Sequence, residues 1–313
     1  MKKILMLGTG GTIACVPSAD GLVPQLDGAA LLELAPQLDG LCHIDCQQIM
    51  NLDSSNLEPR HWQQMAEAIA KNYDAYDGIV VTHGTDTMAY SAAALSQMLR
   101  NCRKPVIFTG AQLPMQTPGS DAPANILHAF TAACSEMQGV GLAFGKQLIH
   151  GGCAKKLYTQ SFDGFVSVNC PPLAIFSNGI MLWQTGQRYG GGWGPGDFSV
   201  HTKLETKVAV IKIIPGTPPD IIDFYLRSGY KGLIIEGFGA GGVPNGANNW
   251  LPQLQKALKA GVKIVCASQC LYDGVHLDTY PIGVLAQRLG AQSAGSATIE
   301  AATVRLMWEL GQE

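Results

Sequence analysis

The chain has 313 residues, of which 47% are hydrophobic and 14% charged, with a formal net charge of −3. This length and apolar content suffice for one large domain or two smaller ones with well-filled cores. The charge and the lack of a Lys/Arg-rich run argue against a nucleic acid or an anionic membrane as the main partner, because neither would be attracted electrostatically. We therefore expect a small-molecule ligand.

Apolar runs alternate with helical patterns along the first half of the chain. This repeated alternation of strand and helix predicts an α/β fold with a parallel sheet. The expected strands are residues 2–8, 43–50, 77–84, 104–110 and 140–145, and the expected helices are residues 28–38, 58–73, 89–99 and 121–137.

A second, shorter alternation follows a Gly-, Pro- and Ser-rich stretch. It gives expected strands at residues 207–214, 231–239 and 262–269, with helices at 219–229, 248–261 and 298–310. Stretches rich in Gly, Pro and Ser commonly join domains. We expect a larger N-terminal α/β domain with a parallel-rich sheet flanked by helices at residues 1–184, a linker at 185–205 and a smaller C-terminal α/β domain at 206–313.

The nine cysteines include no C-x2-C pair. The sequence therefore favours neither a disulfide framework nor a zinc site, and it indicates reduced thiols. Only Ile4 to Leu7 form an apolar run near the N-terminus, well short of the roughly 7 to 15 residues of a signal-peptide core. No segment reaches the about 20 apolar residues of a membrane span. We expect a soluble cytoplasmic protein.

A Gly- and Thr-rich turn, GTGGTIA at residues 8–14, follows the first expected strand. It lacks the third glycine of a dinucleotide-binding fingerprint, because Ile13 stands there and no helix is expected before about Gly28. Thr12 lies on a loop rich in backbone N–H groups, as a nucleophile beside an anion-binding nest would. Threonine is also common in turns of purely structural function.

A second polar turn, THGTDT at residues 82–87, joins an expected buried strand to an expected helix. In an open parallel sheet such turns lie at the carboxyl edge, where ligands bind. Thr85 as a helix N-cap and Asp86 as a charge near the helix N-terminus would be purely structural. That interpretation does not explain why two hydroxyls and a carboxylate crowd the edge that carries Thr12. His83 is expected to be a packed, hydrogen-bonded residue rather than a chemical group.

Together, GTGGTIA and VTHGTDTMAYSA resemble the two signature segments of the L-asparaginase family, in particular its cytoplasmic type I branch. The resemblance covers nearly the whole chain in order. It implies an amidohydrolase that converts L-asparagine to L-aspartate and ammonia, with possible minor glutaminase activity, no metal or cofactor, and a homodimer or homotetramer. The further similar segments are DSSN (53–56), TGAQLP (109–114), SDAPAN (120–125), KLYTQSFDGFVSVNCPPL (156–173), SQC (268–270) and TIEA (298–301).

The resemblance also implies roles for individual residues. Thr12 is the nucleophile, and Thr85, Asp86 and Lys156 form a second catalytic cluster, in which Lys156 is chosen over Lys155 by its spacing to Asn169. An unactivated threonine hydroxyl is a poor nucleophile, so it needs a base or a proton relay, which the lysine can supply through Thr85. Asp86 holds the substrate's α-ammonium. Ser54 binds the substrate's α-carboxylate. The other implied substrate-binding residues are Gly11, Asp53, Ser55, Gly84 and Ala111.

Two positions depart from the family's pattern. Leu22 stands where many members carry a tyrosine that helps to activate the nucleophile. GFGAGG at residues 237–242 lacks the asparagine with which relatives reach a neighbouring subunit's site, and Asp273 and Asn245 are weak candidates to replace it.

Three other functions compete with this hypothesis. An ammonia-releasing subunit of a tRNA-dependent amidotransferase would carry an extra N-terminal domain, whereas the signature here begins within ten residues of Met1. A catalytically silent amino-acid sensor would explain Leu22 but not the retained hydroxyls and Lys156. A dinucleotide-dependent oxidoreductase is disfavoured by Ile13.

Overall fold

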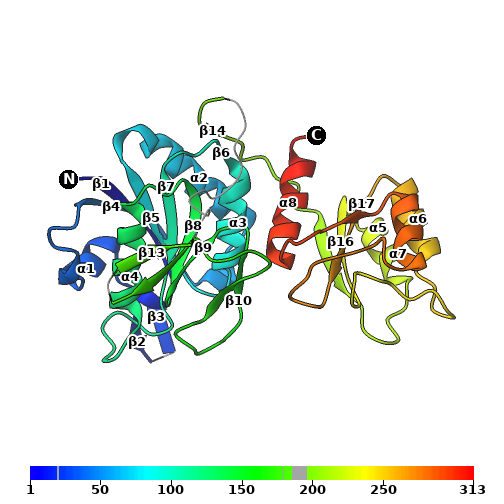
Figure 1. Cartoon of the computed structure of the whole chain (residues 1–313), viewed down its shortest axis with the longest axis horizontal. Helices are drawn as coiled ribbons and strands as arrows, with labels where there is room; N and C mark the ends of the chain where they lie inside the picture. Colours follow the sequence, from blue (N-terminus) through cyan, green and yellow to red (C-terminus); the bar gives the residue numbers. More distant parts are fainter. Residues whose placement is uncertain (20, 179, 185–195) are drawn as a thin grey trace. The chain divides into compact units, whose positions relative to one another are not determined.

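The computed structural model describes residues 1–19, 21–178, 180–184 and 196–313 (Figure 1). The chain divides into two compact units, Met1–Thr202 and Lys203–Glu313. Both are α/β structures, which confirms the predicted fold class. Residues 185–195 of the predicted linker lie outside the described residues, so the predicted domain boundaries stay a prediction.

The N-terminal unit is built on an eight-stranded sheet in the order β13-β12-β9-β8-β7-β5-β1-β4. The five strands from β4 to β8 in this order are parallel, while β9, β12 and β13 are antiparallel to their neighbours. The parallel strands are the long apolar runs of the sequence, as expected of strands covered on both faces. The strands are β1 (Lys3–Gly10), β4 (His43–Leu52), β5 (Gly78–Thr82), β7 (Pro105–Thr109), β8 (Gly139–Phe144), β9 (Gln147–His150), β12 (Ala174–Ser177) and β13 (Ile180–Trp183).

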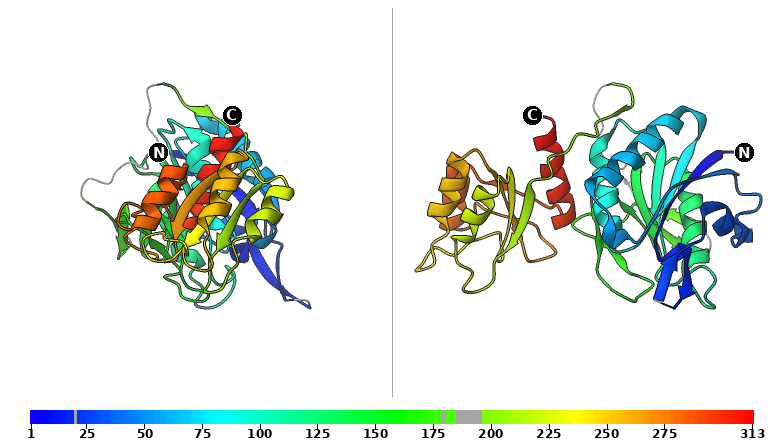
Figure 2. Two further views of the ribbon diagram at one scale, coloured as in Figure 1. Left: turned by 90° about the vertical axis from the view of Figure 1, so that its right-hand side faces the viewer. Right: turned by 180° about the vertical axis from the view of Figure 1, so that it is seen from behind.

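Helices cover both faces of this sheet. Figures 1 and 2 show α1 (Gly28–Glu33) and α4 (Ala122–Ala133) on one face, and α2 (Pro59–Asn72) and α3 (Met88–Met98) on the other. On the first face, Ile4, Met6 and Val80 of the sheet share one buried cluster with Leu31 of α1 and Ile126 of α4. Burying these side chains removes apolar surface from water and fixes the helices against the sheet.

Several short elements were not predicted. They include two hairpins, β2 (Cys15–Ser18) with β3 (Gly21–Pro24) and β10 (Ala154–Lys156) with β11 (Phe165–Ser167), and the pair β6 (Leu99–Arg100) with β14 (Ser199–Val200). Strands of two to four residues are too short to show a period of two in the sequence. The first expected helix is also shorter than its pattern, because Pro36 begins a separate 3-10 turn.

The C-terminal unit has a four-stranded parallel sheet in the order β15-β16-β17-β18. In Figure 1, α5 (Ile221–Arg227), α6 (Leu251–Lys259) and α7 (Pro281–Leu289) lie on one face of the sheet and α8 (Ile299–Gly311) on the other. Its core surrounds the fully buried Trp250. The strands are β15 (Val208–Lys212), β16 (Gly232–Gly237), β17 (Lys263–Ser268) and β18 (Gln292–Ser293).

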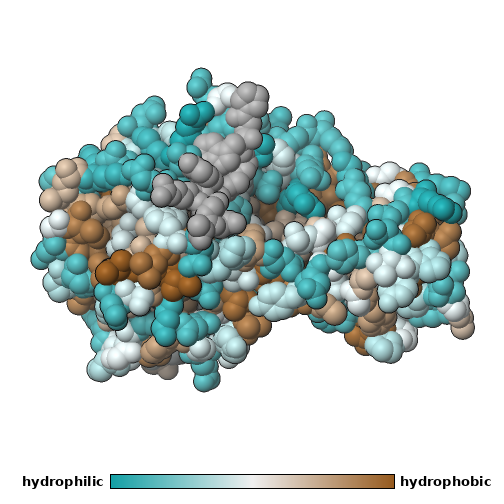
Figure 3. Space-filling view, in the orientation of Figure 1, coloured by the Kyte–Doolittle hydropathy of each residue, from teal (hydrophilic) through white to brown (hydrophobic). Residues whose placement is uncertain are grey.

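The surface of the N-terminal unit carries an apolar strip along β13. Ile180 is 61% exposed and Leu182 is 51% exposed, and β13 is the outermost strand of its sheet. Figure 3 shows hydrophobic side chains gathered in the region where Figure 1 labels β13. Within the described residues, none of the helices has the length and apolar content needed to cross a bilayer.

A disulfide joins Cys153 to Cys170, so the prediction of reduced thiols is wrong for these two cysteines, whereas the other seven are free thiols. Cys153 directly precedes β10 and Cys170 follows the end of β11, so the hairpin brings these two residues together although they are 17 apart in sequence. The contact depends on this hairpin, which the sequence analysis did not predict, so the spacing of the two cysteines alone could not indicate a disulfide.

Replacing Cys170 with serine is expected to lower the free energy of unfolding by about 2–4 kcal/mol, since the disulfide restricts the unfolded chain. Denaturant unfolding without reductant measures this loss, and reduction of the native protein should reproduce it. The control is Cys270→Ser, which removes an exposed free thiol and should leave stability unchanged. Equal stability of the Cys170→Ser variant and the native protein would contradict a stabilising disulfide.

Candidate active site

The turns that follow β1, β4 and β5 meet at one edge of the N-terminal sheet. Strand β1 lies between β4 and β5 and is parallel to both. The chain therefore leaves β1 toward one side of the sheet and later returns to the other side, which opens a crevice at the carboxyl ends of these strands. In open α/β sheets, such a switch point is where ligands bind.

Two glycines let the turns after β1 and β5 touch backbone to backbone. A Cβ at Gly11, which has a φ of 82°, would lie 2.3 Å from the Gly84 nitrogen. A Cβ at Gly84 would lie 2.6 Å from the Ser54 Oγ. No other residue type fits this approach, since these distances are far below van der Waals contact. The glycines of the two sequence motifs thus bring Thr12 and Thr85 to one place.

Replacing Gly11 with alanine is expected to separate the two turns and lower activity at least about 100-fold, as a displacement of about 1 Å costs that much in positioning. The control is Gly216→Ala, because Gly216 has a φ of 93° and a Cβ added there would meet nothing within 4 Å. The Gly216→Ala variant therefore shows the cost of left-handed backbone strain alone, about 1–2 kcal/mol, without a steric clash. Thermal unfolding and ammonia release would be measured for both variants, and an active Gly11→Ala enzyme would contradict the close packing.

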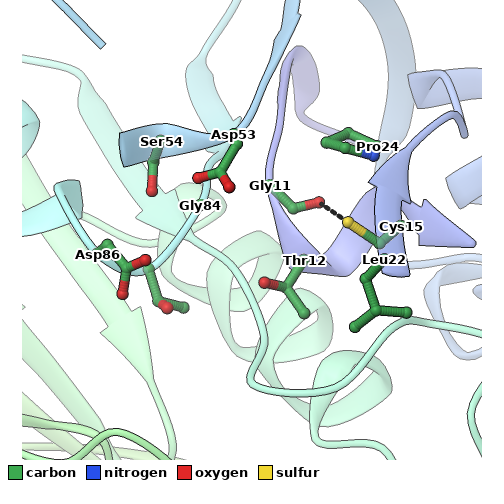
Figure 4. A pocket seen from close by; sticks show the side chains of 10 residues that line it. Gly11, Thr12, Cys15, Leu22, Pro24, Asp53, Ser54, Gly84 and Asp86 are labelled. Atoms are coloured by element: carbon green, nitrogen blue, oxygen red, sulfur yellow. Dashed lines mark hydrogen bonds between the residues drawn. The ribbon is translucent and has the colours of Figure 1, made fainter. Parts of the chain in front are cut away.

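A cavity of about 130 Å³ lies where these turns meet. It is smaller than the roughly 300–1,000 Å³ of sites for drug-sized ligands, so it suits a small molecule. In Figure 4, Thr12 lies across the cavity from Ser54 and Asp86, and its hydroxyl oxygen points toward their side. The lining residues are Gly11, Thr12, Cys15, Leu22, Pro24, Asp53, Ser54, Gly84, Thr85 and Asp86.

Lys156 of β10, some seventy residues further along the chain, contacts two of the residues that line this cavity. Its Nζ donates to the Thr85 Oγ1 at 2.8 Å and to the Asp86 Oδ1 at 2.6 Å. The lysine side chain is 18% exposed, whereas that of Asp86 is 64% exposed. The ammonium is therefore largely withdrawn from water, while the carboxylate stays accessible to a ligand.

The turn after β4 contributes a second group of polar atoms. Asp53 and Ser54 line the cavity, and the Thr87 Oγ1 donates to the Ser54 carbonyl at 2.8 Å, which fastens this turn to the one after β5. Ser55 does not line the cavity. Its backbone N–H and its hydroxyl both donate to the Asp53 Oδ1 at 2.9 Å, so it orients the carboxylate.

Ala111 also lies outside the cavity lining, because it is fully buried in the core of the N-terminal unit. The backbone that follows it is held by a buried carboxylate. The Asp121 side chain accepts hydrogen bonds from the backbone N–H groups of Gln112 and Leu113 at 3.0 and 3.1 Å. These donors are consequently unavailable to a ligand.

Among the lining residues, Cys15 and Pro24 were missed by the sequence analysis. They belong to the β2–β3 hairpin, which follows the Thr12 turn. The Cys15 Sγ lies 3.5 Å from the Gly11 carbonyl, and burial, helped by the Asp53 carboxylate, raises the pKa of this thiol. Cys15 is therefore a neutral thiol. Its position only three residues after Thr12 could have indicated that Cys15 lies at the cavity.

Leu22 of the same hairpin lines the cavity beside Thr12 (Figure 4). It is 53% exposed and its side chain offers no polar atom, so this hairpin brings no phenol to Thr12. Asp273 and Asn245 belong to the C-terminal unit, and they stay weak candidates for the cavity.

The fold and the site thus define a two-domain α/β protein with a small polar cavity at the switch point of its larger sheet. Two family models match the chain, "Asparaginase, N-terminal" at residues 3–188 and "Glutaminase/Asparaginase C-terminal domain" at residues 207–313. The chain belongs to the asparaginase family.

Relatives and solved structures resemble the chain over its full length. An L-asparaginase of Thermococcus kodakarensis is 37% identical, with 99% of this chain and 93% of that protein covered. A subunit of the glutamyl-tRNA(Gln) amidotransferase of Pyrococcus abyssi is 36% identical over 99% of this chain and 72% of that protein.

Among solved structures, the thermostable L-asparaginase from T. kodakarensis superposes with a TM-score of 0.92 at 36% identity, covering 99% of this chain and 93% of that one. The probable cytoplasmic L-asparaginase from Campylobacter jejuni gives a TM-score of 0.84 at 27% identity, covering 100% of this chain and 96% of that one.

Proposed function

We propose that this protein is an L-asparaginase, which hydrolyses the side-chain amide of L-asparagine to L-aspartate and ammonia. One observation carries the proposal. Thr12 and Thr85 line the same cavity, and the hydroxyl of Thr85 accepts a hydrogen bond from the largely buried Lys156. A hydroxyl linked to a buried amine is the arrangement that a proton relay requires.

In the proposed reaction, the Thr12 hydroxyl oxygen attacks the amide carbon and its proton passes to a basic group of the site. The tetrahedral oxyanion is stabilised by backbone N–H groups of the cavity. The Gly11 N–H is already paired with the Leu52 carbonyl at 3.0 Å. We therefore assign the donor role to the N–H groups of Thr12 and Thr85, which both line the cavity. The basic group passes this proton on to the amide nitrogen as the C–N bond breaks, so that neutral ammonia departs. Water then hydrolyses the ester between Thr12 and the aspartyl group, which releases L-aspartate and restores the Thr12 hydroxyl.

The charges of the cavity suit a zwitterionic amino acid. We assign the substrate's α-ammonium to the Asp86 carboxylate, whose exposure keeps it open to a ligand. The α-carboxylate is assigned to the Ser54 hydroxyl. Ser54 lines the cavity, and its backbone carbonyl is held by the Thr87 hydroxyl. Asp53 and Ser55 then act as a pair that shapes this turn.

Steady-state ammonia release with L-asparagine, with L-glutamine and without amide tests the proposal. Hydrolysis of asparagine is expected, and slower turnover of glutamine is compatible with the same site, because one methylene discriminates by only about 1–3 kcal/mol. If neither amide is hydrolysed while asparagine raises the melting temperature, the protein is an amino-acid sensor instead.

The resemblance to the amidotransferase subunit of P. abyssi supports a second candidate function. Such a subunit would release ammonia for a partner enzyme rather than into solution. Ammonia release that rises several-fold when an amidotransferase partner and its tRNA are added would favour this function over free asparagine hydrolysis.

We further propose a cytoplasmic homodimer or homotetramer. The exposed apolar strip of β13 supports self-association, because exposed apolar patches and edge strands mark interaction surfaces. The likeness to a C. jejuni structure described as a probable cytoplasmic L-asparaginase supports the location. Light scattering coupled to gel filtration would measure the oligomer.

A further inference from the structure

The imidazole of His83 is buried directly beneath the candidate site. This residue follows β5, is 0% exposed and does not line the cavity. Its backbone N–H donates to the Thr109 carbonyl of β7 at 2.8 Å, which fixes its main chain to the sheet. A general-base role for His83 is therefore excluded by geometry, since its ring has no access to a bound substrate.

The ring of His83 makes one close polar contact. Its Nδ1 lies 2.6 Å from the carbonyl oxygen of Gly84. A carbonyl oxygen only accepts hydrogen bonds, so Nδ1 must carry the proton. Within the described residues the Nε2 has no hydrogen-bond partner, and the ring packs edge-on against Phe108. Burial lowers the pKa of His83 to about 4, so the imidazole is neutral at physiological pH and holds this one tautomer.

This hydrogen bond determines which way the next peptide group faces. In a trans peptide the carbonyl and the following N–H point in opposite directions. Holding the Gly84 carbonyl against the buried imidazole consequently turns the Thr85 N–H away from the core. Gly84 and Thr85 both line the cavity, and no carbonyl or side chain of the described residues accepts a hydrogen bond from the Thr85 N–H.

We propose that His83 is a positioning residue, which aims the Thr85 N–H at the oxygen that becomes negative during amide hydrolysis. This inference rests on the proposed function. It explains why an imidazole that takes no part in the proposed reaction is buried beside the cavity. The imidazole is neutral, so it adds no charge to the site. It acts only by fixing the direction of the Gly84–Thr85 peptide group.

The test compares three variants in steady-state kinetics with L-asparagine. His83→Leu removes the ring donor and is expected to lower kcat by about 10- to 100-fold, somewhat less than the loss of an oxyanion donor itself, with KM changed by less than about 3-fold. His83→Asn places an amide nitrogen where Nδ1 was and should recover most of that loss. Thr82→Val removes a neighbouring buried hydroxyl that has no described partner, and it should retain the native kcat.

A purely structural histidine would behave differently. An active His83→Leu enzyme with native kcat overturns the inference, and so does a folded His83→Asn enzyme as slow as the leucine variant. Histidine ¹⁵N NMR of the native protein gives a second readout that needs no variant. The neutral Nδ1–H form is expected above about pH 5, and the Nε2–H form would overturn the inference. A native protein without amidase activity would refute the proposed function as well, whereas the variant results concern His83 alone.

Discussion

Replacing Thr12 with alanine is expected to lower kcat for L-asparagine at least about 10⁴-fold, as loss of a nucleophile does in other acyl-transfer enzymes. Alanine keeps the Cβ and so preserves the turn that packs against Gly84. The attacking oxygen and one methyl group are lost. The Cys15 thiol cannot replace the hydroxyl, because burial raises its pKa and its sulfur faces the Gly11 carbonyl. A coupled assay of ammonia release measures the effect.

Two controls accompany this variant. Thr12→Ser keeps an attacking hydroxyl and should retain about a tenth or more of the native kcat, since only a methyl group that restricts the rotamer is lost. Binding of L-aspartate to Thr12→Ala, followed by calorimetry, should remain within a few-fold of native and show an intact cavity. Thr12→Ala with more than a tenth of the native kcat would rule out this residue as the nucleophile.

Replacing Lys156 with methionine is expected to lower kcat by about 10²- to 10⁴-fold, the usual contribution of proton transfer by a positioned group. The lysine donates to both Thr85 and Asp86, so its loss removes the amine behind the Thr85 hydroxyl. It also leaves the Asp86 carboxylate without its cation. Methionine has similar length and fills the same space, which limits the effect on packing.

Lys155→Met is the matched control, because neighbouring residues of a strand point to opposite faces and Lys155 therefore points away from Thr85. It should keep the native kcat. Lys156→Arg retains a cation for Asp86 but its guanidinium stays protonated and cannot accept a proton. A slow Lys156→Arg enzyme would indicate a proton relay, whereas native activity in this variant would reduce Lys156 to an ion-pair partner.

Among the described residues that line the cavity, no side chain besides Thr12 and Thr85 is an obvious activator of the nucleophile, which makes Lys156 the candidate activator. The ten residues that line the cavity include no tyrosine, and the hairpin position next to the nucleophile is Leu22. We therefore assign the activation of Thr12 in the proposed reaction to the Lys156–Thr85 contact. This assignment gives the Lys156 variants their large expected effect.

Much of the fold could be predicted from the sequence because its parallel strands are long, apolar and rich in β-branched residues. The strands β1, β5 and β7 are buried on both faces. Such continuous apolar runs can be recognised as strands from the sequence alone, without knowledge of the strands they pair with. The hairpins β2–β3 and β10–β11 were missed, since three or four residues carry no visible period. Cys15 and Leu22 line the cavity from the first hairpin, and Lys156 contacts Thr85 from the second. The geometry of the site therefore depends on elements that local sequence patterns do not reveal.

The sequence by itself determined the chemistry: the two Gly- and Thr-rich turns, their places after buried strands and the family to which they belong. Only the tertiary structure decided which of these groups share a cavity. In the tertiary structure, the Ser55 hydroxyl orients the Asp53 carboxylate, and Ala111 is buried in the core. The tertiary structure also turned the His83 ring toward the Gly84 carbonyl. The physical reason is that strand order and backbone contacts such as that of Gly11 with Gly84 arise from packing between distant segments, which no local pattern of residues encodes.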